Sequence, residues 1–306
     1  MRLPRPALLC FWHLRFWNLG LLTLAVASSA LAAPAEDADK SSAEKVQLQY
    51  KFKMGQVLRY QVKHEANVTT TLEETTQDVE SVSDSVKAWK VTDVLPNGEI
   101  EFMHVVESIK MTNRQPQQGV AKYDSTTGEQ PPAIFQQAAS AVGVPMTLIR
   151  MTPTGKIVHR EEKHPQPEVT KDMPITLEMS GKPIAVGEQW DHDYEVPVDR
   201  KNGGKQQVRT RRLCKLTSVK SGVATIEVTY QVLTPIDPFV KSQLLERMTK
   251  GTVRFDIAEG RVLSQRHEVD RRVLGFAGKT SSMHFVSRLE EKLIKEGASK
   301  AKVARR

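Results

Sequence analysis

The residues of this chain that could do chemistry are few, and their spacing keeps them apart. Asp191, His192 and Asp193 follow one another in a stretch typical of a β-strand. Successive side chains of a strand point to opposite faces, so the two carboxylates cannot converge with the imidazole on one metal ion. His159 and His164 flank a charged stretch and have no cysteine near them, which is not a zinc-ligand pattern. We therefore expect no metal site, no cofactor and no catalytic residues.

Short catalytic motifs are also absent from the sequence. It contains no nucleophile elbow, no phosphate-binding loop, no dinucleotide-binding glycine pattern and no HExxH pair. We expect a protein that is not an enzyme. An activity carried by an unrecognised set of residues is the alternative.

A second group of residues could bind an apolar ligand. His104 stands in an alternating stretch between Phe102 and Val106, so we expect it on the apolar face of a strand. There it is either a hydrogen-bonded core residue or the polar group of a ligand cavity. The candidate cavity lining is Phe102, His104, Val106, Phe135, Ile226, Val228, Tyr230 and Leu244.

The first 32 residues have the features of a secretory signal peptide. Three arginines and no acid precede the apolar run of residues 19–27, and a small-x-small site follows at residues 30–32. We expect cleavage after Ala32 and export to the periplasm, the cell envelope or the medium. An uncleaved membrane anchor over residues 16–33 is the alternative.

The mature chain of about 270 residues keeps a single cysteine, Cys214, so it cannot form an internal disulfide. The cations Arg211, Arg212 and Lys215 beside it could lower its thiol pKa. We favour the simpler interpretation, a small buried side chain. Asn67 begins a formal glycosylation sequon.

The formal net charge of +8 is concentrated at the two ends of the chain. The signal peptide contributes three cations and residues 292–306 contribute six against one acid, which leaves residues 33–291 neutral. A neutral body excludes a broad phosphate-binding face, so we expect no nucleic-acid partner. The basic tail could contact an anionic envelope surface, or serve only solubility; its terminal cations are Lys300, Lys302, Arg305 and Arg306.

Landmarks of the chain recur in the same order and predict a tandem duplication. They are a Gly-started strand (Gly55, Gly187), a hairpin (Asn97-Gly98, Ser221-Gly222), a helix (residues 132–142, 237–250) and a second turn (Gly155, Gly260). Asp237 is expected to cap the second helix, with Pro238 at its first position and Gly251 just beyond its end. The expected segments are signal peptide 1–32, linker 33–46, first β-rich repeat 47–159, connector 160–182, second β-rich repeat 183–291 and basic tail 292–306.

The pattern of elements predicts the α+β class, mainly antiparallel β. No strand–helix–strand alternation is present that would indicate a parallel sheet. We expect two tandem pseudo-repeats, each a curved antiparallel sheet with one short amphipathic helix. The polar stretch 67–86 is expected as one long strand, exposed or at a sheet edge, with a disordered loop as the alternative.

Several short motifs resemble an uncharacterised domain-of-unknown-function family of exported bacterial proteins. They are Phe52 with Gly55 and Tyr60, the YDS of residues 123–125, the Gly-Lys-Ile turn and the VGEQW of residues 186–190. The resemblance implies an exported, two-part β-rich protein without an assigned activity.

At the level of fold alone, the chain is similar to periplasmic lipoprotein carriers, whose curved antiparallel sheet holds an acyl chain. We therefore expect an exported, non-enzymatic protein that binds a lipid or another hydrophobic ligand. The alternative is a structural or adaptor protein of the envelope, which contacts anionic polymers through its basic tail.

Overall fold

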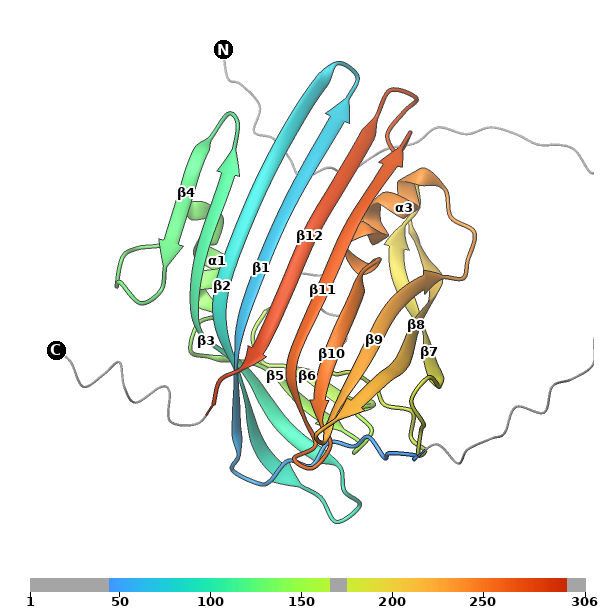
Figure 1. Cartoon of the computed structure of the whole chain (residues 1–306). Helices are drawn as coiled ribbons and strands as arrows, with labels where there is room; N and C mark the ends of the chain where they lie inside the picture. Colours follow the sequence, from blue (N-terminus) through green and yellow to red (C-terminus); the bar gives the residue numbers. More distant parts are fainter. Residues whose placement is uncertain (1–43, 166–174, 296–306) are drawn as a thin grey trace, which may run out of the picture.

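The computed structural model describes residues 44–165 and 175–295 (Figure 1). The strands are β1 (Val57–Leu72), β2 (Thr75–Val94), β3 (Ile100–Gln115), β4 (Gly119–Asp124), β5 (Pro145–Met151), β6 (Ile157–Glu162), β7 (Gln189–Asp199), β8 (Lys205–Lys220), β9 (Val223–Val232), β10 (Lys250–Asp256), β11 (Arg261–Leu274) and β12 (Ser282–Leu293). The helical elements are η1 (Ala133–Phe135), α1 (Gln136–Ser140), α3 (Pro238–Leu244) and η2 (Leu245–Arg247). No helix of the described residues combines the length and the apolar character that a membrane span needs.

All twelve strands belong to one open, curved sheet. Its order is β6-β5-β3-β2-β1-β12-β11-β10-β9-β8-β7, with β4 beside the outer part of β3. Every pairing of the sheet is antiparallel, which confirms the predicted fold class. The predicted halves are not separate sheets, because β1 pairs with β12 along twelve residue positions from Tyr60↔Leu293 to Thr71↔Ser282.

The four landmark turns occupy matching places in the strand order. Gly98 lies between β2 and β3, and Gly222 lies between β8 and β9. Gly155 lies between β5 and β6, and Gly260 lies between β10 and β11. A common origin of the two halves stays a prediction.

One extended segment before β1 joins the two later turns. The backbone N–H of Tyr50 donates to the carbonyl of Pro153 at 2.7 Å, and that of Lys51 donates to the carbonyl of Gly260 at 3.1 Å. The approach is close: a Cβ added at Gly155 would lie 2.6 Å from the Tyr50 ring. At Gly260 it would lie 2.5 Å from the Lys51 nitrogen. Glycine recurs at both turns because this segment leaves no room for a side chain.

The concave face of the sheet is defined by its main core. Leu58 and Tyr60 of β1 pack in the same cluster as Cys214 of β8 and Ile226 of β9, although these strands are far apart in the sheet order. Such contacts require the sheet to curve around them. Aromatic rings fill this main core, with Trp89 stacked on Phe102 at 4.8 Å.

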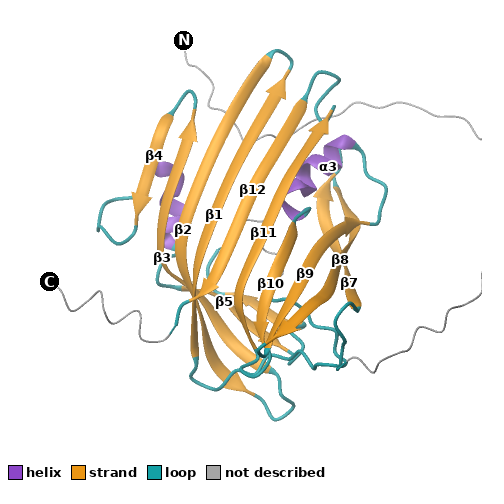
Figure 2. Cartoon of the chain, viewed as in Figure 1, coloured by secondary structure: helices purple, strands orange, loops and turns teal. Residues whose placement is uncertain are grey.

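The helices lie on the same concave side, behind the long central strands in Figure 2. Val240 and Leu244 of α3 pack on Val208 of β8 in what we name the α3 cluster. Leu245 of η2 packs against Val273 of β11 and other tip residues in what we name the η2 cluster. The α3–η2 segment therefore crosses the concave side from β8 to β11.

The prediction for residues 67–86 was wrong in its topology. The stretch is the outer half of β1, a turn and the outer half of β2, paired throughout from Val57↔Lys90 to Leu72↔Thr75. It is neither a disordered loop nor an edge, since β1 lies between β2 and β12. The turn gives no sequence signal, because Glu73 rather than glycine takes the positive φ of 54°.

The predicted end of the second helix was also wrong. Asp237 caps α3 as expected, because its Oδ1 accepts a bond from the Val240 N–H at 2.9 Å, and Pro238 begins the helix. The helix ends at Leu244 and continues as the 3₁₀ turn η2. Gly251 is a residue of β10, opposite His267, and not a helix terminator.

Candidate functional site

The predicted cavity-lining residues lie in separate clusters on the concave side. Phe102, Ile226 and Val228 belong to the main core, and each is at least 98% buried. Leu244 belongs to the α3 cluster, and Phe135 stacks on Tyr123 of β4 at 6.5 Å. The structure thus brings three of these residues together. That these residues contact a ligand stays a prediction.

His104 and Val106 flank a β-bulge of β3. The register against β5 shifts between His104 and Val105, so Val105 is buried while Val106 is only partly buried. His104 lies opposite Trp89 on the face of the main core. Burial, with smaller effects of the Lys87 and Arg160 charges, lowers the pKa of His104 to about 3. The imidazole is therefore neutral at neutral pH.

Polar side chains occupy the middle of the concave face, between the main core and the helical clusters. Along β8, the inward residues run from Cys214 in the main core through Arg212 to Val208 in the α3 cluster. Along β12 they run from Leu293, packed on the main core, through Glu291 to Phe285 in the η2 cluster. We name this set the polar belt. It consists of Lys87, Glu291, Gln265, His267, Arg212 and Tyr230.

One end of the polar belt is a buried ion pair. Lys87 Nζ lies 2.6 Å from Glu291 Oε2, and the two side chains are 15% and 4% exposed. Gln265 Nε2 donates to the same carboxylate oxygen at 3.0 Å. The ammonium group also lies 5.4 Å from the centre of the Tyr60 ring and 5.2 Å from that of Trp89, which are cation–π distances.

His267 continues the belt from Gln265. Its Nε2 lies 3.1 Å from Gln265 Oε1. Because the amide nitrogen of Gln265 donates to Glu291, its oxygen must accept, so His267 carries its proton on Nε2. Burial, with a smaller effect of the Arg212 charge, lowers the pKa of His267 to about 4. Its other ring nitrogen, Nδ1, faces Gly251, where an added Cβ would lie 2.2 Å away.

Arg212 differs from Lys87 in its partners, because it donates to neutral oxygens whereas Lys87 contacts a carboxylate. It is only 9% exposed, and its Nη2 donates to the Tyr230 hydroxyl at 2.7 Å while Nη1 donates to the Thr176 carbonyl at 3.1 Å. The guanidinium carbon lies 5.4 Å from the centre of the Tyr230 ring. Among the residues that the structure describes, no carboxylate forms an ion pair with Arg212. Burial lowers the pKa of this guanidinium.

Cys214 lies one inward position from Arg212 and is fully buried. Burial raises the pKa of its thiol to about 12, and the nearby Arg212 charge offsets this only in part. A thiol with so high a pKa forms almost no thiolate at neutral pH, so Cys214 is a poor nucleophile.

The Asp191–Asp193 segment separates as strand alternation predicts. Asp193 accepts from Arg211 Nε at 2.6 Å on the outer face, whereas His192 Nδ1 lies 3.4 Å from Glu178. Within residues 44–165 and 175–295, no three His, Cys, Asp or Glu side chains gather where they could hold a metal ion. Lys300, Lys302, Arg305 and Arg306 lie outside the described residues, so their contact with an anionic surface stays a prediction.

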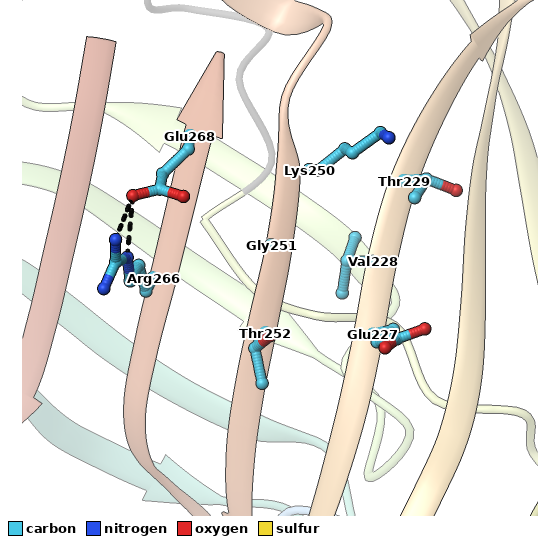
Figure 3. A pocket seen from close by; sticks show the side chains of 8 residues that line it. All are labelled: Glu227, Val228, Thr229, Lys250, Gly251, Thr252, Arg266 and Glu268. Carbon is cyan, nitrogen blue, oxygen red and sulfur yellow. Dashed lines mark hydrogen bonds and ion pairs between the residues drawn. The ribbon is translucent and has the colours of Figure 1, made fainter.

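A groove of about 540 Å³ lies over β9, β10 and β11, mostly between outward-facing side chains (Figure 3). Its residues are Glu227, Val228, Thr229, Lys250, Gly251, Thr252, Arg266 and Glu268. Glu227 and Thr252 alternate with the main-core residues Val228 and Val253, so they point to the convex face. The groove is open and polar, and of the predicted lining it contains only Val228.

The sequence contains one signal for the polar belt, the basic stretch of residues 208–215. In a strand, side chains two positions apart share a face, which places Arg212 on the face of Cys214. Two further residues of the polar belt also point to the concave face, His267 from β11 and Glu291 from β12. Only the curvature of the sheet shows that they share one interior.

The geometry defines an open, curved, antiparallel sheet with short helices on its concave side. No family model matches the chain, and no curated protein matches it. The resemblance to a family of exported bacterial proteins therefore rests on its short motifs alone.

The chain has weak similarities to solved structures, including the following two. One is described as lipid–protein interactions in lipovitellin: TM-score 0.42, 10% identity, 80% of this chain covered. The chain spans 26% of that lipovitellin chain. The other is DynF from the dynemicin biosynthesis pathway of Micromonospora chersina: TM-score 0.22, 7% identity, 87% of this chain and 95% of that chain covered.

Proposed function

We propose that this protein is an exported, non-enzymatic binder of a lipid or another hydrophobic ligand, which it holds against the concave face of its sheet. The observation that carries this proposal is a set of apolar inward side chains that the protein does not bury completely. Val62, Ala66 and Val68 share the face of Leu58 and Tyr60 on β1, yet they stay partly exposed. We name this region the open concave surface.

Neighbouring strands extend the open concave surface. Val79 of β2 and Phe285 of β12 lie on either side of Val68, and both are partly exposed. Leu289 of β12, level with His64 of β1, is partly exposed as well. His64 and Ser287, whose Nε2 and Oγ lie 3.0 Å apart, interrupt these apolar side chains. A mainly apolar concave site with a few polar groups is typical of a ligand-binding region. An acyl chain laid there would gain roughly 0.8 kcal/mol for each methylene group removed from water.

Ligand binding can be tested with the purified full chain after removal of bound lipid. We expect a fluorescent fatty acid to bind saturably, with one ligand per chain. Val68→Asp places a charge on the open concave surface and should weaken binding about tenfold or more, since one buried apolar side chain contributes roughly 1.5–3 kcal/mol.

The matched control is Val286→Asp, the same substitution on the strand beside Val68 but on the other face, where the side chain is 38% exposed. This variant should bind as the unchanged protein does. Absence of saturable binding by the unchanged protein would overturn the proposed function. If both variants lost binding affinity equally, the concave face would not be the binding site.

Export rests on the leader pattern of residues 1–32. Expression of the full chain in a bacterial host, followed by amino-terminal sequencing of the exported fraction, should give a chain that begins at Ala33. A chain that keeps Met1 and stays with the membrane would support the anchor alternative instead.

A further inference from the structure

We propose that Arg212 binds the anionic headgroup of the ligand, so that the protein selects acidic amphiphiles over neutral ones. This inference rests on the proposed function and assigns a chemical class to its ligand. The observation behind it is a buried guanidinium without a counter-ion among the described residues.

A buried charge is costly unless an opposite charge compensates it. The polar belt follows this rule at its other end, where Lys87 contacts Glu291 at 2.6 Å. The bonds described for Arg212 are to neutral oxygens, those of Tyr230 and Thr176. Glu178 acts on Arg212 electrostatically, but its ion-pair contact is with His192. Within residues 44–165 and 175–295, Arg212 is therefore a buried positive charge without an ion-pair partner.

The fork of a guanidinium suits a group with two anionic oxygens. Arg212 has five N–H groups, and its three described bonds leave donors for a ligand. Carboxylates and phosphates both accept two parallel bonds from such a fork. The two headgroups share this chemistry, and direct comparison of probes separates them.

The position of Arg212 connects it to the open concave surface. Its charge acts on His267, which is itself uncharged at neutral pH and so does not compensate it. His267 pairs in register with Leu289, which in turn pairs with His64. A headgroup at Arg212 would therefore lie beside the polar belt, with its chain directed along the apolar side chains of β12 and β1.

The test uses displacement of an uncharged fluorescent probe from the full chain by three ligands of equal chain length: dodecanoate, dodecyl phosphate and dodecanol. We expect at least one of the two anions to bind about tenfold or more tightly than the alcohol, as a charge-assisted bond to a buried guanidinium implies. The tighter anion identifies the headgroup. Equal affinities for all three would overturn the role of Arg212 and leave the proposed function standing. If none of the three binds, the proposed function itself fails.

Substitution of Arg212 tests whether this residue causes the selectivity for anions. Arg212→Gln should lower the affinity for the preferred anion to about that for dodecanol. Arg209→Gln is the matched control, because Arg209 lies on the same strand with its side chain 63% exposed on the outer face. Unchanged selectivity in Arg212→Gln would contradict the proposal. Should that variant fail to fold, the three-ligand comparison on the unchanged protein still decides it.

Discussion

Among single residues, two buried imidazoles contribute to how this protein responds to acid. His267 and His104 have pKa values lowered from 6.5 to about 4 and about 3, in both cases mainly by burial. The unfolded chain takes up these protons at higher pH than the folded one does. The stability that they contribute is therefore complete above pH 6.5 and is lost as the pH falls toward these lowered values.

His267→Gln should reduce this acid sensitivity. The lowered pKa of His267 corresponds to about 3 kcal/mol of unfolding free energy lost as the pH falls from 6.5 to 4. Urea unfolding at several pH values measures the slope, which should be smaller in the variant. His159→Gln, the same substitution at an exposed residue, should keep the slope of the unchanged protein. A slope that His267→Gln leaves unaltered would argue against a neutral His267 in the folded state.

At the scale of elements, the short α3–η2 segment depends on its cap and its contacts. A helix of seven residues is too short to be stable alone. Packing on β8 and the hydrogen bond that Asp237 Oδ1 accepts from the Val240 N–H therefore maintain it. Gln243 of α3 also bonds to the sheet: its Nε2 donates to the carbonyl of Asp199, at the end of β7, at 3.0 Å. This segment crosses the concave side, so its loosening should affect ligand binding as well as stability.

Asp237→Ala should lower the free energy of unfolding by about 1 kcal/mol, because it leaves the Val240 N–H without its acceptor. Asp237→Asn keeps a capping oxygen and should cost much less. Urea unfolding of the three proteins at one pH gives the comparison. If Asp237→Asn were as destabilising as Asp237→Ala, charge rather than capping would explain the effect.

At the scale of the whole molecule, the contact of β1 with β12 makes one sheet of the two predicted halves. The Lys87–Glu291 pair bridges this junction, since it joins β2 to β12 across β1. A buried pair of this kind adds little net stability, but removal of one partner leaves the other charge buried and alone.

Lys87→Met should therefore lower the free energy of unfolding by about 3–5 kcal/mol, and the double variant Lys87→Met with Glu291→Leu should recover most of that loss. Thermal or urea unfolding of both variants measures the difference. A double variant no more stable than Lys87→Met would contradict this explanation. It would show that the pair is needed to hold β2, β1 and β12 together, and not only to neutralise the Glu291 charge.

Local features of this protein follow from residues close together in the chain, whereas their arrangement in space follows from contacts between distant residues. Three such features depend on neighbouring residues and can therefore be predicted from the sequence. They are the alternation along β9, the turns at Gly98 and Gly222, and the Asp237 cap. The turn at Glu73 has no such signature.

The single sheet, its concave face and the polar belt depend on pairings between residues far apart in the chain. Lys87 and Glu291, or Tyr60 and Leu293, come together only when β12 pairs with β1. No local pattern at either residue specifies that partner, because strand pairing selects among many strands of similar composition. None of the residues of the open concave surface was in the predicted cavity lining, because their shared face depends on these pairings. The buried Arg212, which has no carboxylate partner among the described residues, likewise emerged only from the fold.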